Sequence, residues 1–565
     1  MKQLMHKTKI DKGYEALQGL YALLTYAAIS IALFGKQTIF HLNDFLLRST
    51  VNDSGAFVWF LNWWPYAIDH KLNFFISKEI WVPTGFNMAH ATAVPFLSLI
   101  SLPITLFLSP IVAFNLIAIF TTALSAWTAY LLCKYITKSF FSSLLGGYFF
   151  GFSAYQIFFT SYGDINITSI FLIPVLMLLA LFFLHKKIRR FSFTLLTTIC
   201  LVCQFLISVE IFLTSAFFAA IFWYCAIRIY KDYRAQLLSC GFYVLISYLI
   251  ATIIVSPYIY YFFLTPLPDK FMDSLLEINT FAGLFIPAKE MLLHYDKLLP
   301  YIGHFGPGYL GIPAAVVLLL FSLKNWGTRQ GKLLIIFFLI VLILSFGFGF
   351  EVFSKKGGDL PNFWFPLPAM ALHYIPVIKH AMPFRFIMYA TLSMSVIMAL
   401  WLSAKKDFFR YTIAFISILF ILPTLQTAYW SGEIQAPRFF TEKHYYEKWL
   451  KPKENVLILP FYFYGYDMLW QIEANMYFRQ LGGFASAALP YEFRNEPMIK
   501  VLMYEKPIDN KTPAMFKAFL KQHGVTAVIV DPLLNNYWKK LLVKIQKNPF
   551  ASGGVLIYKL SSAKP

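Results

Sequence analysis

Charged residues are scarce in this sequence: Asp and Glu supply 28 of its 565 residues and Lys and Arg 48, whereas 58% are hydrophobic. A soluble domain of this composition would expose far too much apolar surface to water. Apolar runs such as 18–34, 111–133 and 165–184 have about the 20 residues that a helix needs to cross a membrane. These runs lack the alternation of polar and apolar residues that a membrane barrel requires. The sequence therefore predicts a polytopic α-helical membrane protein.

The signature motifs of soluble enzymes are also missing. There is no Walker A loop, dinucleotide glycine fingerprint, HExxH motif or nucleophile elbow. The glycine-rich stretch GHFGPGYLG (303–311) lacks the spacing of a phosphate-binding loop, so we expect a tight turn there. The five cysteines all lie in or at the end of apolar runs and show neither zinc spacing nor a disulfide framework. Any chemistry must therefore come from polar residues near the membrane.

The basic residues set the predicted orientation. The net charge is +20, which in a soluble protein would suggest a nucleic-acid partner, but these charges cluster in short loops between the apolar runs. Such an excess of Lys and Arg is typical of cytoplasmic loops. If residues 96–108, a short run broken by Pro103, lie at the outer interface without crossing, then all these loops are cytoplasmic: CKYITK, HKKIRR, RIYKDYR, KNWGTRQGK and KKDFFR. Nucleic acid is not an expected partner.

This choice predicts about eleven spanning helices. The basic amino terminus has no convincing cleavage site, so we expect an uncleaved first span with a cytoplasmic amino terminus. Residues 36–110 then form a long external loop with interfacial helices. The predicted spans after the first lie at 111–133, 142–159, 166–184, 191–208, 211–229, 238–262, 309–323, 333–350, 385–403 and 411–430.

The composition changes after residue 430. Strand-like runs occur at 455–460, 525–532 and 553–560, and helical patterns lie between them at 441–450, 511–523 and 533–546. We therefore expect a transmembrane domain over 1–430 and a small α/β domain over 431–565. The second domain is long enough to bury its own core and is predicted to lie outside the membrane.

Carboxylates at the predicted outer face are the first candidates for a functional site. Asp44 and Asp53 lie in the first external loop, and Asp164 lies between the third and fourth spans in TSYGDINIT. An ionised group beside hydrocarbon is a functional candidate by default because its desolvation is costly. A structural alternative stays open, in which Asp53 and Asp164 cap helices. For Glu210, near the end of the fifth span, we expect a structural hydrogen bond.

The apolar stretch FVWFLNWWPYAI (57–68) and the run 96–108 form a predicted shelf of two helices at the outer interface, with Asp53 at its edge. A protein that only spans the membrane has no need of such a shelf. This layout of first loop and spans resembles a known superfamily: DSGAFVWFLNWWP after the first span, WVPTGFN at 81–87, an interfacial helix, a span ending AYLLCKY, and then GGYFFGFSAY with a following GD.

These features resemble the GT-C superfamily of integral-membrane glycosyltransferases, which includes protein O-mannosyltransferases, oligosaccharyltransferase catalytic subunits and lipid A aminoarabinose transferases. The resemblance covers roughly residues 15–190. It implies that Asp53 is the key catalytic carboxylate and Asp164 a nearby second acid. Many members carry paired acids where this chain has single ones, so dependence on Mg²⁺ or Mn²⁺ stays open, with Asp53 and Asp164 as the candidate ligands.

The resemblance also implies a sugar donor carried on a polyprenyl phosphate in the bilayer. A base must then take the proton of the acceptor hydroxyl, and a cation must hold the leaving phosphate. Arg385, at the start of the tenth span with Lys379 just upstream, is the candidate for the phosphate, because a guanidinium can hold two phosphate oxygens. The alternative for Arg385 is extension towards the interface. His294 and His304 are candidates for an acceptor pocket, or are simply solvated.

The resemblance therefore implies a glycosyltransferase, which we expect in the plasma (inner) membrane and cell envelope. It would transfer a sugar to a glycan, lipid or protein acceptor on the outer, periplasmic face. Three alternatives are a transporter or flippase of lipid-linked sugars, an O-antigen-type polymerase or ligase, and a structural anchor for the carboxyl-terminal domain, which would not need eleven spans. A transporter would place charges near the middle of its spans and often shows repeated halves, and no repeat is visible in the sequence.

Overall fold

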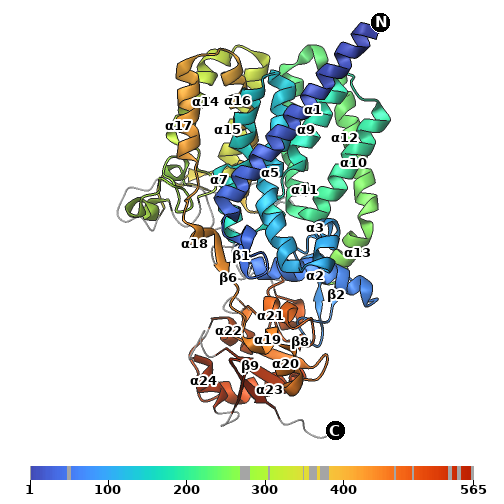
Figure 1. Cartoon of the computed structure of the whole chain (residues 1–565), viewed down its shortest axis with the longest axis vertical. Helices are drawn as coiled ribbons and strands as arrows, with labels where there is room; N and C mark the ends of the chain where they lie inside the picture. The colour runs from blue at the N-terminus through green and yellow to red at the C-terminus, as the bar shows by residue number, and fades with distance from the viewer. Residues whose placement is uncertain are drawn as a thin grey trace. The chain divides into compact units, whose positions relative to one another are not determined.

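Helices dominate the computed structural model (Figure 1), as the apolar runs predicted. The structure describes residues 2–560 except 48–52, 267–279, 303–305, 348, 355–364, 369–380, 463–465, 486–488, 505, 532–536 and 544–548, and side chains are described outside 2–12, 365–366 and 539–540. Contacts divide the chain into two units. The first comprises Met1–Phe40, Leu116–Val255 and Asp273–Ser431, and the second His41–Asn115, Ser256–Met272 and Gly432–Pro565. The predicted division at residue 430 stays a prediction.

The first unit is a bundle of helices. Their bounds are α1 (Lys2–Ser30), α5 (Pro110–Thr137), α6 (Phe140–Gly151), α7 (Ala154–Tyr162), α8 (Ile165–Thr168), α9 (Leu172–Leu184), α10 (Arg190–Ile207), α11 (Val209–Ile229), α12 (Arg234–Ile254), α14 (Ile312–Asn325), α15 (Arg329–Ser345), α16 (Ile387–Ser403), α17 (Phe408–Phe420) and α18 (Thr427–Trp430). A short antiparallel pair, β4 (Gly349–Phe350) and β5 (Phe365–Pro366), lies between α15 and α16 in the chain.

Local capping explains where the helices that carry the candidate residues begin and end. The side chains of Ser153 and Ser208 accept backbone N–H groups at the starts of α7 and α11. Such a cap fixes a helix start because the first N–H groups have no partner within the helix. α7 ends at Gly163, whose φ of 75° is a left-handed conformation that glycine adopts without strain. The chain therefore turns sharply just before Asp164.

Among the described residues, seven helical segments are long and apolar enough to cross a membrane: Gly13–Gly35, Pro110–Thr137, Ile165–Leu184, Arg190–Ile207, Val209–Ile229, Lys231–Ile254 and Pro383–Ser403. The other predicted spans fall on the shorter helices α6 with α7, α14, α15 and α17. The total of about eleven spans therefore stays a prediction. The interfacial run at 96–108 forms α3 (Pro95–Ile100) and α4 (Leu102–Phe107), whose six residues each are too few to cross.

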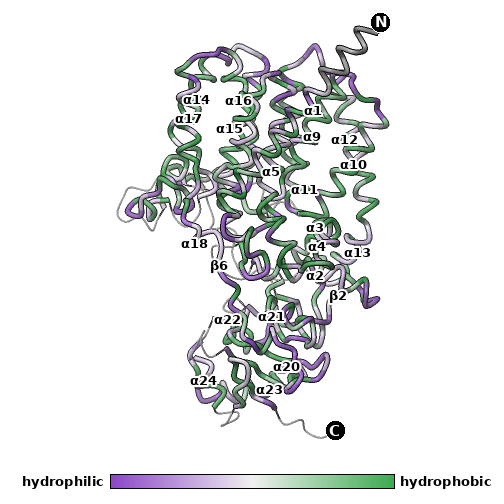
Figure 2. The backbone as a smooth tube through the Cα atoms, viewed as in Figure 1, coloured by the Kyte–Doolittle hydropathy of each residue, from purple (hydrophilic) through white to green (hydrophobic). Residues whose placement is uncertain are grey.

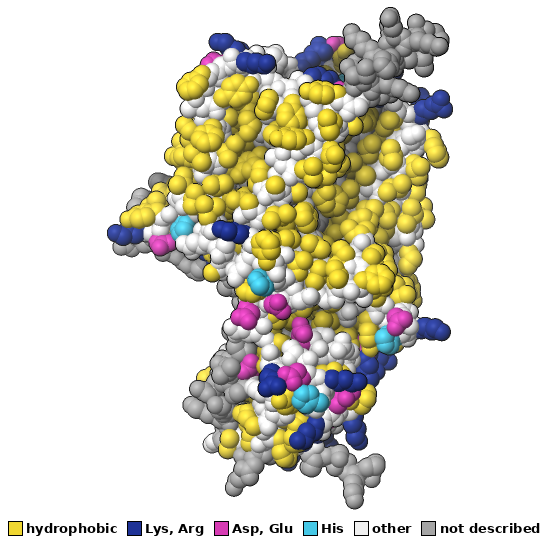
Figure 3. All heavy atoms as spheres, in the orientation of Figure 1, with side chains coloured by type: hydrophobic (Ala, Val, Ile, Leu, Met, Phe, Trp, Pro, Cys, Tyr) yellow, Lys and Arg dark blue, Asp and Glu magenta, His cyan; other side chains and the backbone are white. Residues whose placement is uncertain are grey.

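Several of the predicted cytoplasmic loops contact one another. Arg329, the first residue of α15, forms an ion pair of 2.6 Å with Asp232, before α12. The hydroxyl of Tyr135, near the end of α5, lies 2.7 Å from Nδ1 of His185, after α9. Figure 3 shows Lys and Arg side chains at the end of the bundle that carries the amino terminus. The basic loops therefore gather at one end of the helices, as the charge pattern predicted, although which side of a membrane this end faces stays a prediction.

The outer surface of the bundle is apolar. Large hydrophobic side chains are exposed along α1, α12 and α14, among them Leu24, Leu249 and Leu323. Figures 2 and 3 show hydrophobic residues along the helices and over the visible face of this unit. Soluble proteins rarely expose an apolar surface of this extent. Together with the spanning lengths, it indicates that lipid surrounds these helices.

The second unit contains a five-stranded sheet with the strand order β10-β11-β9-β7-β8. Strand β7 (Asn455–Leu459) pairs in parallel with β8 (Arg479–Gln480) and β9 (Ala527–Val530), while β11 (Val555–Lys559) is antiparallel to β9 and to β10 (Phe550–Ser552). The three predicted strand-like runs therefore lie at β7, β9 and β11. The helices of this part are α19 (Arg438–Thr441), α20 (Lys443–Trp449), α21 (Asp467–Glu473), α22 (Pro497–Tyr504), α23 (Thr512–Gln522) and α24 (Tyr537–Leu542).

The first loop belongs to this second unit. It contributes β1 (Phe45–Leu47), which pairs with β6 (Ser431–Glu433), the helix α2 (Asp53–Asp69), and the hairpin of β2 (Ile76–Ser77) and β3 (Phe86–Asn87), and α13 (Ser256–Leu264) joins it. Whether α2 lies at the membrane interface, as the predicted apolar shelf requires, stays a prediction. Trp59 and Trp63 are fully buried in protein, because α2 packs against α21. Exposed apolar residues of the loop lie on α3 and α4, with Phe107 86% exposed, and also around the end of α2, at Ile68, Leu72 and Phe74.

Candidate active site

An ion pair joins two helices of the first unit. Arg385 lies in the 3₁₀ turn Pro383–Phe386 that leads into α16, and Glu210 lies in the first turn of α11. Nη1 of Arg385 is 2.5 Å from Oε2 of Glu210, and the two side chains are 21% and 24% exposed. A lone charge near hydrocarbon costs about 3 kcal/mol or more, so each residue needs such a partner. The hydrogen bond expected for Glu210 is therefore present, and Arg385 is the donor.

The rest of the Arg385 side chain is enclosed by aromatic rings. Its guanidinium carbon lies 5.4 Å from the centre of the Phe159 ring and 5.8 Å from that of Phe384, and Nε is buried with no hydrogen-bond partner among the described residues. This packing inside protein differs from extension towards the interface. A buried N–H donor without an acceptor costs free energy. The arrangement therefore suits an anion that accepts a hydrogen bond from the side of the guanidinium group that Glu210 does not occupy.

Asp164 lies close to this ion pair. It occupies the N-cap position of α8, but its side chain makes no capping hydrogen bond, and it is half-buried. Its charge and that of Glu210 both act on Arg385 and on the buried phenol of Tyr155. The structure thus brings Asp164, Glu210 and Arg385 together. The capping alternative does not account for the Asp164 carboxylate.

An apolar cavity of about 720 Å³ begins one helical turn from the ion pair. It lies among α9, α10, α11, α12, α15 and α16, and few of its lining residues are polar, among them Ser215, Tyr248 and Tyr389. The hydroxyl of Tyr389, four residues after Arg385, lies 2.9 Å from that of Thr214, which follows Glu210 by four residues. Because residues four apart share a helix face, α11 and α16 meet at both levels. The cavity therefore leads from an apolar surrounding towards the charged groups.

Asp53 lies in the second unit. It is the first residue of α2 and is half-buried. A carboxylate there is stabilised by the helix dipole, so a structural role at the helix start stays open. Asp53 and Asp467 both act electrostatically on the buried phenol of Tyr462, which places the starts of α2 and α21 around one ring. Burial raises the pKa of Asp467 to about 7. Asp53 thus has a second carboxyl group nearby that is partly protonated at neutral pH.

The remaining predicted residues are not brought to the ion pair by the described contacts. His294 stays within its own loop, where Nδ1 lies 2.7 Å from the carbonyl oxygen of Met291 and Nε2 lies 3.7 Å from Asp296. His304 and Lys379 fall outside the described residues. Within the described ranges, no three or more His, Cys, Asp or Glu side chains are grouped as metal ligands. The described residues therefore provide no ready-made cation cage.

Sequence reasoning undervalued Glu210 and missed Tyr389 and Tyr155. A signal for Glu210 was available, since a carboxylate inside a spanning helix predicts a basic partner in another span, and Arg385 is a rare Arg of that kind. Tyr389 had no such signal, because tyrosines are common in this sequence and its role follows only from the meeting of α11 with α16.

The fold is similar to those of solved glycosyltransferases. The oligosaccharyltransferase AglB from Archaeoglobus fulgidus, in complex with an inhibitory peptide and a dolichol-phosphate, matches with a TM-score of 0.53 at 11% identity, over 98% of this chain and 75% of that one. The apo oligosaccharyltransferase of the same organism matches at 0.52 and 12%, over 91% and 69%. The arabinofuranosyltransferase AftD from Mycobacteria matches at 0.55 and 12%, over 96% of this chain and 40% of that one.

No protein-family model matches the sequence, and neither does any curated protein. At identities this low the similarity shows a shared fold. It confirms, at that level, the expectation of a helical membrane fold like that of the oligosaccharyltransferase subunits, which are among the proteins that the motifs resemble. The closer grouping with O-mannosyltransferases or aminoarabinose transferases stays a prediction.

Proposed function

We propose that this protein is a membrane glycosyltransferase that moves a sugar from a polyprenyl-phosphate-linked donor to an acceptor on the outer face of the membrane. The observation that carries this proposal is the position of Arg385, paired with Glu210 one helical turn from a large apolar cavity. A polyprenyl phosphate needs both an apolar path for its chain and a cation for its phosphate. The fold shared with an oligosaccharyltransferase and an arabinofuranosyltransferase supports the same chemistry.

Arg385 would hold the phosphate. Glu210 fixes one arm of the guanidinium and neutralises it in the unliganded protein, while Nε is left as a buried donor. When the bond between the anomeric carbon and the phosphate oxygen breaks, the negative charge that grows on that oxygen is stabilised by the guanidinium. Groups already held in place supply this stabilisation without reorganisation, which is why the pairing with Glu210 matters.

Asp53 would act as the general base, with Asp164 as a second acid. The acceptor oxygen forms a bond with the anomeric carbon, its proton passes to the Asp53 carboxylate, and polyprenyl phosphate leaves. A positioned base contributes about 10²–10⁴-fold in rate. This assignment rests on the sequence resemblance, and kinetics test it. No step is routed through a metal ion, and dependence on Mg²⁺ or Mn²⁺ is decided by adding and chelating these ions.

The site predicts chemistry at the membrane face, whereas a flippase or transporter of lipid-linked sugars would move the donor unchanged. An O-antigen-type polymerase or ligase would join lipid-linked glycans to one another or to a lipid acceptor. The identity of the acceptor distinguishes a polymerase or ligase from the proposed transferase, because its product carries a second glycan or a lipid. Mass spectrometry of the products therefore separates the transferase from the polymerase or ligase, and the leaflet in which the donor accumulates separates both from the flippase.

The experiment compares lipid-linked and surface glycans, by mass spectrometry, in cells with and without the gene and in cells that produce Arg385→Ala. We expect that loss of the gene or of Arg385 removes one sugar from the surface glycans and accumulates its lipid-linked precursor. Unchanged glycans in both strains would contradict the proposal. Loss of the surface sugar with donor trapped on the inner leaflet would indicate a flippase instead.

A further inference from the structure

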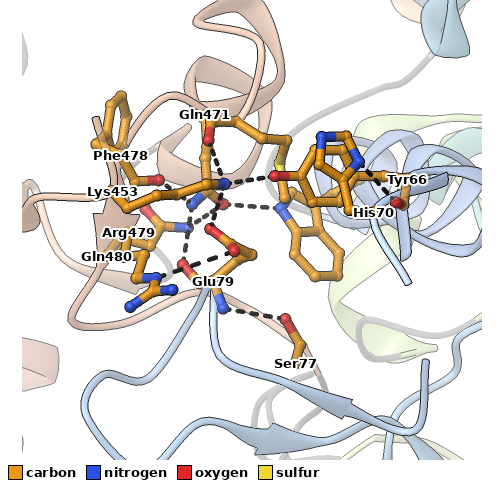
Figure 4. Close-up of polar contacts among 11 residues, drawn as sticks. Tyr66, His70, Ser77, Glu79, Lys453, Gln471, Phe478, Arg479 and Gln480 are labelled. Carbon is orange, nitrogen blue, oxygen red and sulfur yellow. Dashed lines mark hydrogen bonds and ion pairs between the residues drawn. The ribbon is translucent and has the colours of Figure 1, made fainter. Parts of the chain in front are cut away.

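A buried carboxylate in the first loop is held by the carboxyl-terminal segment. Glu79, which follows β2, is only 3% exposed. Its Oε2 lies 3.0 Å from Nζ of Lys453, just before β7, and its Oε1 lies 3.9 Å from Nε of Arg479 in β8. Figure 4 shows these side chains converging on Glu79. A buried charge of this kind is tolerated only while its partners are present.

Lys453 also reaches the helix that begins with Asp53. Its ammonium group donates to the hydroxyl of Tyr66, near the end of α2, and to the carbonyl oxygen of Met476 at 2.9 Å. One ammonium group thus ties three segments together: the hairpin residue Glu79, helix α2 and the chain before β8 (Figure 4). Among the described residues, removing this charge would leave the Glu79 carboxylate with the 3.9 Å contact to Nε of Arg479.

Gln471 of α21 holds α2 at a second point. Its Oε1 accepts from Nε1 of Trp59 at 2.8 Å, and its Nε2 donates to the carbonyl oxygens of Glu79 and Phe478, each at 2.9 Å. Gln471 is fully buried, so these groups have no water to replace a lost partner. Both donors and the acceptor of the amide are used, which fixes the distance between α2, the hairpin and β8.

The first loop also extends the sheet of the carboxyl-terminal segment. Ile80 forms a parallel bridge with Gln480 of β8. The backbone N–H of Gln480 donates to Glu79 at 2.9 Å, and that of Trp81 donates to Gly482 at 3.1 Å. Nε1 of Trp81 donates to the carbonyl oxygen of Gly483 at 2.8 Å. Residues 79–82 therefore lie along the edge of β8 as an added strand, which covers that edge.

Helices α2 and α21 lie side by side in the same direction. A Cβ atom added at Gly55 would lie 3.5 Å from Cβ of Leu469, and Trp59 meets Gln471. Later residues of α2 contact later residues of α21, so the two helices begin at the same end. Asp53 and Asp467, their first residues, therefore lie near each other, as their shared effect on Tyr462 also indicates. The start of α2 is thus set by the carboxyl-terminal segment.

We propose that the carboxyl-terminal segment is the scaffold that positions Asp53, with Lys453 and Gln471 as the positioning residues that fix α2. The carboxyl-terminal segment is therefore more than an independent appended domain, because the first loop completes its sheet and shares its buried network of hydrogen bonds. This inference rests on the proposed function only for the role of Asp53 as the general base. Its structural part stands on the contacts around Glu79, Trp59 and Tyr66.

The test removes one positioning contact at a time. Lys453→Met keeps the aliphatic stem and loses the charge, and Trp59→Phe removes the N–H donor together with the pyrrole half of the buried indole. Lys451→Met, an exposed lysine two residues away, is the matched control. Transfer is assayed in nanodiscs with total lipid-linked oligosaccharide extracted from the producing cells. We expect kcat to fall about tenfold or more with KM for the extract within about twofold, since a small displacement of a reacting group costs this much.

A reversible tether separates positioning from general damage. Gly55→Cys with Leu469→Cys places two Cβ atoms within the range that a disulfide spans. The five native cysteines all lie in α5, α10, α11 and α12, in the first unit. We expect the disulfide to form under mild oxidation and to restore kcat of Lys453→Met or Trp59→Phe towards that of the tethered parent, while the reduced protein stays impaired.

Three results would overturn the proposal: no disulfide in the double-cysteine parent, wild-type kcat in Trp59→Phe and Lys453→Met, or a loss of kcat that the oxidised tether does not repair. If Lys453→Met does not accumulate, Trp59→Phe decides. Failure of the proposed function is seen separately. In that case Asp53→Asn keeps its activity, while disulfide yield and the protease resistance of the first loop still report whether the scaffold exists.

Discussion

Arg385 and Glu210 show how single side chains carry charge inside an apolar bundle. Their hydrogen bond joins residues 175 positions apart, and Asp164 adds a second negative charge nearby. The pair neutralises itself while leaving Nε of Arg385 as a buried donor. The planar guanidinium of Arg has five N–H donors, so it can pair with Glu210 and still donate to a second anion. The ammonium group of Lys is a compact point charge and lacks this geometry.

Arg385→Lys is expected to raise KM for a long-chain polyprenyl-phosphate donor about tenfold or more, with little change in Tm. Lys keeps the charge that Glu210 needs but loses the fork that would hold phosphate oxygens. Donor titrations and thermal melts of the purified variant check this. Arg329→Lys, in the exposed ion pair with Asp232, is the control. An unchanged KM together with a lower Tm would make Arg385 a purely structural residue.

Asp467 gives a pH-dependent prediction at the same scale. Burial raises its pKa to about 7 from an ordinary 3.8, so the unfolded chain releases this proton first and stability falls as pH rises from about 4 to 7. Asp467→Asn removes that penalty. We expect the gain in stability of the variant to be larger at pH 8 than at pH 5 by about 2–3 kcal/mol. Thermal melts at both pH values measure it, and an equal gain at both would contradict the assignment.

At the scale of elements, helices α11 and α16 place the charged groups one turn from the cavity. The rings of Phe218 and Tyr389 contact each other at a tilt, with 4.5 Å between their centres, and both line the cavity. The cavity is apolar over most of its lining, so it offers a hydrocarbon chain dispersion contacts without competing polar groups. A lipid phosphate whose chain lies there would reach Arg385 without crossing water.

Filling the cavity is therefore expected to weaken donor binding. Ala219 lines the cavity, and Ala219→Trp places a large side chain in it. We expect KM to rise several-fold for a long polyprenyl phosphate and little for a short-chain analogue, because only the long chain needs the blocked space. Ile253→Trp, on the exposed face of α12 outside the cavity lining, is the control. Equal effects of the two variants would argue against a lipid-binding role.

Helix positions in the first unit could be predicted from sequence because long apolar runs leave few other structures. The surroundings of α2 could not. Its aromatic residues required an apolar environment, but composition cannot distinguish lipid from a protein interior, and the structure buries most of these residues in protein, in part against α21. The contacts of Glu79 with Lys453 and of Trp59 with Gln471 join residues 374 and 412 positions apart, and no local pattern marks such pairs.

At the scale of the whole molecule, the gathering of basic loops at one end of the bundle agrees with the predicted topology. We expect reporter fusions after Lys138, Lys187, Lys231, Lys324 and Lys405 to report cytoplasmic, and fusions after Pro268, Asp359 and Pro565 to report external. Alkaline phosphatase and fluorescent-protein fusions together measure both sides. A cytoplasmic signal from the carboxyl terminus would refute the outward-facing site, whatever the fold.

The central claim is that Asp53 serves a transfer that releases polyprenyl phosphate. The direct measurement incubates the purified protein in nanodiscs with extracted lipid-linked oligosaccharide and acceptor, and follows free polyprenyl phosphate by mass spectrometry. We expect release by the wild type and a loss of about 10²-fold or more in Asp53→Asn, because the amide cannot take the proton. Asp53→Asn with Asp164→Asn should be little worse, as residues acting in one step are not additive. Release by a folded Asp53→Asn protein at the wild-type rate would contradict the claim.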